Sequence, residues 1–121
     1  MKLMNQNVKV IGLMSGTSLD GLDLVACQLN YDGARWAYHI CHTETVSYSN
    51  EWLGRLSVDY KIGSKALSCL DHEYGRYLGE MVSSFISRTG FSPEIVCSHG
   101  HTVLHQPEKS ITFQVGLGSS V

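Results

Sequence analysis

The chain has 121 residues, of which 43% are hydrophobic and 17% charged, and this composition excludes a disordered tail. Its 9 basic and 11 acidic residues give a net charge of −2, so no basic excess favours nucleic acid as a partner. No apolar run is long enough to cross a bilayer, and the N-terminus has no apolar segment typical of a signal peptide. We therefore expect one cytoplasmic domain with neither a membrane nor a nucleic acid as partner.

Three strands are predicted in the first part of the chain. Residues 8–14 and 22–29 are rich in β-branched and apolar side chains. The Asp-Gly pair at 32–33 is a hairpin signal, and a third strand at about 35–46 follows it. These segments predict an antiparallel meander.

Two helices are predicted next. Asn50 is expected to cap a short helix that ends at about Leu56. A long helix is predicted from about 64 to 89, although the capping-box spacing of Ser68 and Asp71 leaves a later start open. Its apolar residues recur every three or four positions and form one stripe: Leu67, Leu70, Tyr74, Leu78, Met81 and Phe85.

The last third of the chain predicts a short buried strand at 94–97, a polar loop at 98–102 and a strand at 111–115. A meander, a crossover helix and a parallel strand resemble the opening half of a ribonuclease-H-like α/β domain. Such domains continue with further strand–helix units. We therefore expect residues 1–121 to form an incomplete domain, the N-terminal part of a longer protein.

Cysteines occur in the apolar-patterned segments, and none forms a Cys-x-x-Cys pair: Cys27, Cys41, Cys69 and Cys97. We expect these side chains to be reduced core thiols, as is usual in a cytoplasmic protein.

The segment between the first two strands, MSGTSLDGLD, carries glycines, hydroxyl side chains and carboxylates: Ser15, Gly16, Thr17, Ser18, Asp20, Gly21 and Asp23. Glycines leave backbone amides uncovered, and the hydroxyls add donors, so the loop is suited to an anion such as phosphate. Carboxylates beside a phosphate require a cation, for which Mg²⁺ is the natural choice. A plain turn of the same composition is the open alternative. A Walker A loop is excluded because no Gly-Lys-Ser/Thr is present.

A second polar segment, SHGHTVLHQP, follows the strand at 94–97. Zinc is disfavoured because His99 and His101 are two residues apart and no nearby cysteine or carboxylate completes a tetrahedral site. A nucleophile–base pair of Ser98 and His99 is disfavoured because neighbours on a strand point to opposite faces. A surface loop and a polar substrate-binding loop both remain open, and histidine and threonine suit sugar hydroxyls.

Together, these two segments resemble the N-terminal part of the anhydro-N-acetylmuramic acid kinase family. The likeness extends to Leu-Asp-His-Glu in the long helix and to Thr-Phe-Gln-Val-Gly at 112–116. Members are longer than this chain and belong to the actin, Hsp70 and sugar-kinase class of folds. They hydrolyse the 1,6-anhydro bond of anhydro-N-acetylmuramic acid and phosphorylate its 6-hydroxyl, giving N-acetylmuramic acid 6-phosphate during peptidoglycan recycling. The resemblance thus implies ATP, Mg²⁺ and a small amino-sugar substrate, and it leaves a homodimer open.

The resemblance also assigns roles to residues. It implies ATP binding by Gly16, Thr17, Ser18, Leu19, Asp20, Gly21, Leu22 and Asp23, with Asp20 also the contact to Mg²⁺. It implies substrate binding by Ser98, His99, Gly100 and Thr102. His101 stands where the family usually has glutamine, and the catalytic aspartate is expected beyond Val121. A non-catalytic nucleotide- or sugar-binding module with the same half-fold is the alternative.

Overall fold

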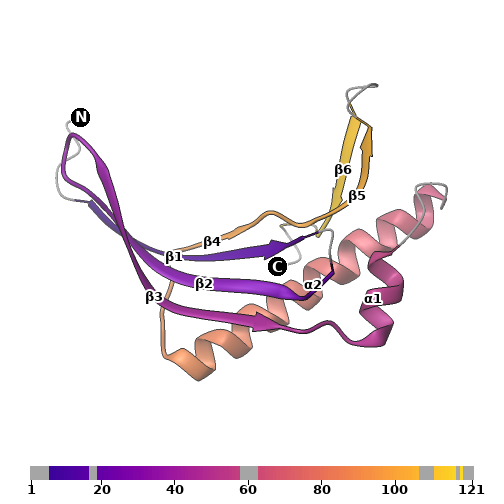
Figure 1. Cartoon of the computed structure of the whole chain (residues 1–121), viewed down its shortest axis with the longest axis horizontal. Helices are drawn as coiled ribbons and strands as arrows, with labels where there is room; N and C mark the ends of the chain where they lie inside the picture. Colours follow the sequence, from indigo (N-terminus) through magenta and orange to yellow (C-terminus); the bar gives the residue numbers. More distant parts are fainter. Residues whose placement is uncertain (1–5, 17–18, 58–62, 107–110, 117, 119–121) are drawn as a thin grey trace.

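A computed structural model describes residues 6–16, 19–57, 63–106, 111–116 and 118 of the chain (Figure 1). The elements in chain order are β1 (Gln6–Ser15), β2 (Leu22–Tyr31), β3 (Trp36–Val46), α1 (Asn50–Leu56), α2 (Ser64–Thr89), β4 (Ile95–Ser98), β5 (His101–Gln106) and β6 (Ile111–Val115). Within these ranges no helix is both long enough and apolar enough to cross a membrane.

Strands β1, β2 and β3 form the expected antiparallel meander, and β4 adds to β1 in parallel, which gives the order β3-β2-β1-β4. The chain passes from β3 to β4 through α1 and α2, which lie on one side of the sheet (Figure 1). Strands β5 and β6 pair only with each other and form a hairpin at one end of the sheet (Figure 1). The chain is therefore a mixed α/β unit with one helical layer on one sheet.

The core lies between α2 and the sheet. Four stripe residues of α2 are buried, Leu70, Tyr74, Leu78 and Phe85, and Leu67 and Met81 are partly buried against them. Alternate residues of β1 and β2 face this stripe because side chains on a strand alternate between faces: Ile11, Leu13, Leu22, Leu24 and Ala26. Each large apolar side chain buried in this way contributes about 1.5–3 kcal/mol. The predicted helix stripe is confirmed.

The start of one helix differs from the sequence prediction, and the start of the other agrees with it. Ser49 caps α1, because its Oγ accepts a hydrogen bond from Trp52 N at 3.3 Å, and Asn50 is the first helical residue. Helix α2 begins at Ser64 after Gly63, which confirms the predicted start at about 64 and excludes the later start left open by Ser68. The correction at α1 arises because the neighbouring residues Ser49 and Asn50 are both good N-caps, and the structure uses Ser49.

Strand β4 was expected to be buried, but Ile95 is 49% exposed and Val96 is 40% exposed. One edge of β4 pairs with β1, and no strand of the described residues pairs with the other edge. Residues 101–106, expected to begin in a loop, form β5 instead. The expectation of core thiols is also wrong for Cys41, Cys69 and Cys97, which are exposed, while Cys27 is half-buried and all four are free.

The sheet face opposite α2 carries large apolar side chains that are about half exposed or more: Met14, Trp36, Tyr38, Ile40 and Ile95. An exposed apolar patch of more than a few hundred Å² favours association. We therefore expect the 121-residue chain on its own to self-associate, with a sedimentation coefficient that rises with protein concentration. A single species of monomer mass at all concentrations would contradict this expectation.

Candidate functional site

The two polar segments of the sequence meet at one edge of the sheet. Strands β1 and β4 are parallel, so their carboxyl ends lie side by side, with Leu13 paired to Ser98. The amide of His99 donates to the carbonyl of Leu13 at 3.1 Å, which extends this pairing beyond β4. Two residues later, Nδ1 of His101 lies 2.9 Å from Oγ of Ser15. The carboxyl ends of parallel strands are the usual place for ligands in α/β sheets.

The loop after β1 is closed by its own backbone. The amide of Leu19 donates to the carbonyl of Gly16 at 3.1 Å, and the Leu19 side chain packs against the core. Leu19 has a φ of 59°, a left-handed conformation that costs about 1–2 kcal/mol in a residue with a side chain. The core contact offsets this cost and holds Leu19 in place. Thr17 and Ser18, expected to bind ATP, lie outside the described residues.

Gly21 ends the loop where it passes close to the end of β3. Its φ is 152°, and a Cβ at this position would lie 2.6 Å from the carbonyl oxygen of Val46. Gly21 is buried, so its role is to let two backbones approach closely rather than to expose an amide. The neighbouring Leu22 is a core residue that is 1% exposed. Its side chain therefore anchors the end of the loop in the core.

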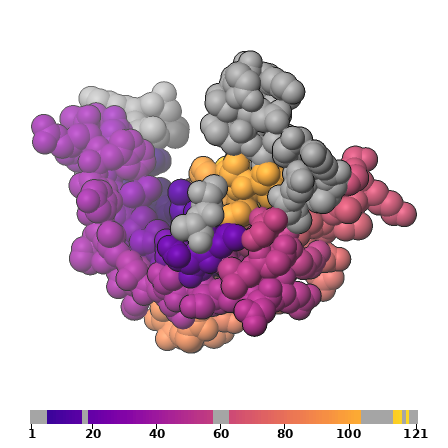
Figure 2. Space-filling model, turned by 45° about the vertical axis from the view of Figure 1, so that its right-hand side comes forward, coloured from indigo at the N-terminus to yellow at the C-terminus, as the bar shows by residue number. Residues whose placement is uncertain are grey.

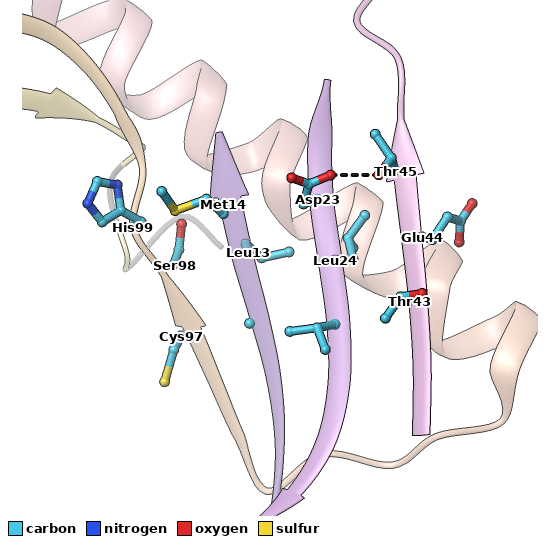
Figure 3. Close-up of a pocket in the computed structure, with 12 residues that line it drawn as sticks. Leu13, Met14, Asp23, Leu24, Thr43, Glu44, Thr45, Cys97, Ser98 and His99 are labelled. Atoms are coloured by element: carbon cyan, nitrogen blue, oxygen red, sulfur yellow. Dashed lines mark hydrogen bonds between the residues drawn. The ribbon is translucent and has the colours of Figure 1, made fainter. Parts of the chain in front are cut away.

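The two carboxylates of the loop lie in different surroundings. Asp20 is exposed, in the coil just before β2. Asp23 is at the start of β2, and its Oδ1 accepts a hydrogen bond of 2.6 Å from Thr45 Oγ1 on β3 (Figure 3). The hydroxyl of Ser15, expected to help bind an anion, is instead buried and used in internal hydrogen bonds. That expectation for Ser15 is therefore wrong.

The donor chemistry of the loop fits Mg²⁺ at Asp20. Among the described residues, no group of three or more His, Cys, Asp or Glu side chains is placed to hold a metal ion. A dedicated protein cage is not what Mg²⁺ requires, since it usually takes one or two carboxylates together with waters and substrate phosphates. The exposed carboxylate of Asp20 meets this requirement, whereas Asp23 already shares one oxygen with Thr45.

The segment after β4 turns sharply at Gly100. Its φ is 73°, and a Cβ here would lie 2.6 Å from the carbonyl oxygen of Val115 on β6. The amide of Gly100 donates to Oγ of Ser98 at 3.2 Å, and the Ser98 side chain is otherwise exposed. Gly100 is buried in the turn, while Ser98 and His99 lie on the surface beside it.

Gln114 on β6 joins two of the predicted substrate-binding residues. Its Nε2 lies 3.2 Å from Nδ1 of His99 and 3.4 Å from Oγ1 of Thr102, to which it donates. Sequence reasoning gave Gln114 no role, although a single amide within the apolar run ITFQV was the available signal. The result is a polar row of imidazole, amide and hydroxyl, which are side chains suited to binding sugar hydroxyls.

A hollow of about 710 Å³ lies on the open face of the sheet and reaches the ends of these strands. Asp23, Thr45, Met14, Cys97, Ser98 and His99 are among its lining residues, and Figure 3 shows Met14 between the β1 and β4 sides. Figure 2 shows the surface hollowed between the violet arm of β2 and β3 and the orange residues near position 100. This volume is within the range of small-molecule sites.

A buried row of hydrogen bonds runs below the two loops. Tyr48 OH donates to Ser15 Oγ at 2.6 Å and lies 2.6 Å from the hydroxyl of Tyr74 on α2. Ser15 Oγ also contacts Nδ1 of His101, which is 2% exposed. Burial lowers the pKa of His101, and it raises the pKa of Tyr74 above its ordinary value. Both shifts favour the neutral forms of His101 and Tyr74 at pH 7.

Comparison with known proteins agrees with this arrangement. A family model described as anhydro-N-acetylmuramic acid kinase matches residues 8–121. The chain is 31% identical over 117 residues to the protein of that name from Pseudoalteromonas translucida, covering 88% of this chain and 29% of that protein. For the Photobacterium profundum protein of that name the identity is 32% over 119 residues, with 93% and 30% covered. For the Brucella canis protein of that name it is 34% over 123 residues, with 92% and 32% covered.

The chain spans about 30% of the length of these curated relatives. The family match nevertheless includes the loop after β1, the segment after β4 and the strand that carries Gln114. The chain belongs to the anhydro-N-acetylmuramic acid kinase family.

Proposed function

We propose that residues 1–121 are the N-terminal ATPase-like subdomain of a longer, two-domain cytoplasmic sugar kinase with a ribonuclease-H-like fold of the actin and Hsp70 class. The longer enzyme hydrolyses the 1,6-anhydro bond of anhydro-N-acetylmuramic acid and phosphorylates its 6-hydroxyl with ATP. One observation supports this most strongly. The Gly16–Asp23 loop and the Ser98–Thr102 segment, far apart in sequence, lie at one edge of one sheet.

In this proposal the Gly16–Asp23 loop binds the phosphates of ATP. In the described part of the loop, Leu19 and Gly21 are held by a backbone hydrogen bond and by the close approach to β3, and we expect them to keep these positions when nucleotide binds. Preorganised hydrogen-bond donors lose little conformational freedom on binding, and they stabilise the charge that develops during phosphoryl transfer. Asp20 holds Mg²⁺, which when bound neutralises phosphate charge and leaves the γ-phosphoryl group open to attack.

The Ser98–Thr102 segment faces the sugar in the same proposal. His99 and Thr102 are held in a row by Gln114, so their polar atoms present a fixed pattern to sugar hydroxyls. The second domain and the aspartate that activates water belong to the longer kinase. Chemistry in a cleft between two domains requires closure and exclusion of water, so we expect the 121-residue chain alone to be inactive.

Isotope labelling of the full-length kinase tests the proposed reaction. Water adds across the anhydro bridge, so its oxygen becomes the anomeric hydroxyl, while the freed 6-oxygen receives the phosphoryl group and ADP leaves. In H₂¹⁸O the product is expected to carry one ¹⁸O on the sugar and none from solvent in the phosphate. Nucleotide binding without any such product would favour the alternative, a non-catalytic binding module.

Replacing His99 with alanine is expected to lower activity while changing stability by no more than about 1 kcal/mol. His99 is exposed at the rim of the hollow, so the change leaves no cavity. Steady-state kinetics and the melting temperature of the full-length kinase check the two parts. Gln114→Glu is a useful companion, because it keeps an acceptor but removes the amide donor to Thr102. Intact kinetics with a large fall in melting temperature would instead make His99 a structural residue.

A further inference from the structure

One donor order satisfies every hydroxyl in the buried row of hydrogen bonds. Tyr48 gives its proton to Ser15 Oγ, so at the Tyr48–Tyr74 contact Tyr74 is the donor. Ser15 then has its own proton to give to Nδ1 of His101. Each hydroxyl donates once in this order, and Nδ1 of a neutral imidazole with its proton on Nε2 is the acceptor that ends the row.

Ser15, in the middle of this row, is the residue from which the proposed phosphate-binding loop leaves β1. Ser15 is the last residue of β1, and the next residue, Gly16, supplies the carbonyl that closes the loop on Leu19. Leu19 and Gly21 fix the far part of the loop through the core and the end of β3. The loop departs from Ser15, whose backbone pairs with Leu22 and whose hydroxyl is held by two partners from distant segments of the chain.

We propose that His101 is a positioning residue for the phosphate-binding loop: by accepting the proton of Ser15, it fixes the residue from which the loop departs. The inference rests on the proposed function, because phosphate binding by this loop is part of that function. His101 itself is buried below the loop and makes no contact with solvent that would let it bind nucleotide. Its effect therefore passes through Ser15, and small displacements of binding groups are costly.

The test compares His101→Ala with His101→Asn in the full-length kinase. Alanine removes the acceptor, so the KM for ATP is expected to rise about 10-fold while kcat changes less than about threefold. Asparagine places an amide oxygen close to where Nδ1 lies and is expected to restore KM to within about threefold of the wild type. His39→Asn, a change at an exposed histidine of β3, is the matched control and is expected to leave KM unchanged.

A second comparison tests whether Ser15 and His101 act together or whether each substitution simply disturbs the fold. Ser15→Ala deletes one hydroxyl and is expected to raise KM as much as His101→Ala, with the double variant no worse than either single change. Ser15→Ala also serves where His101→Ala does not fold. Calorimetric titration with a non-hydrolysable ATP analogue measures the same loss without turnover.

Each outcome decides between the two proposals. Loss of analogue affinity in His101→Ala, recovered in His101→Asn, supports the positioning role even if the sugar proves to be a different one. A wild type that binds the analogue while His101→Ala binds it equally well overturns the positioning role alone. A wild type that does not bind the analogue overturns phosphate binding by the loop, and the positioning role with it.

Discussion

Asp20→Asn is expected to lower the turnover of the full-length kinase roughly 100-fold or more. Asp20 is an exposed carboxylate in the loop after β1, and in the proposed function it would hold Mg²⁺. Asparagine keeps the size of the side chain but loses its charge, so the metal is bound weakly and phosphate charge is less well neutralised. A coupled ADP-release assay at saturating sugar measures the effect.

The control for Asp20→Asn is Glu80→Gln, which removes an exposed carboxylate from α2 and is expected to leave turnover unchanged. Raising the Mg²⁺ concentration is expected to recover part of the lost activity in the Asp20 variant. Turnover within a factor of three of the wild type would contradict a role for Asp20 in catalysis.

Gly21→Ala is expected to reduce the free energy of unfolding by about 2–4 kcal/mol. Two costs combine at this position. The φ of 152° is a conformation that side-chain-bearing residues rarely adopt, and the new Cβ would lie 2.6 Å from the backbone oxygen of Val46. Neither backbone can move without breaking the pairing of Leu22 with Val46, so the strain cannot relax locally.

Gly54→Ala provides the matched control, since a Cβ at Gly54 in α1 would have no neighbour within 4 Å. This change is expected to raise stability by about 0.5–1 kcal/mol, because alanine favours a helix more than glycine does. Urea unfolding of both variants beside the wild type gives the difference. Equal stability of the two variants would mean that the loop does not approach β3 closely.

The sequence predicted the meander and α2 from the spacing of apolar residues, which differs between a strand and a helix. The apolar stripe of α2 repeats every three or four residues, and burial of Tyr74 and Phe85 confirms it. Strand β5 was missed because its histidines and threonine resemble a loop, and it is a strand only through its pairing with β6. The prediction that β4 is buried was wrong because an apolar run in the sequence does not reveal what covers it. Ile95 faces the open side of the sheet.

The candidate site was predicted in part. The positions of the two polar segments follow from strand order, because the parallel ends of β1 and β4 must meet. The contacts beneath them do not follow from any local pattern. Ser15 and His101 are 86 residues apart in sequence, and Ser15 and Tyr48 are 33 apart. Such pairings depend on the final packing of α2 against the sheet, which spacing along the chain does not encode.

The parallel pairing of β4 with β1 has a consequence for folding, because it joins segments that are far apart in the sequence. The meander needs only residues 6–46, whose contacts are between neighbours in sequence, and it can form early. The pairing of Val10 with Ile95 closes a far longer loop and secures only four residue pairs. We therefore expect the contact between Ser15, beside the loop after β1, and His101 to form late in folding. A ribosome-bound chain that has not yet released residue 101 would carry the loop without that contact.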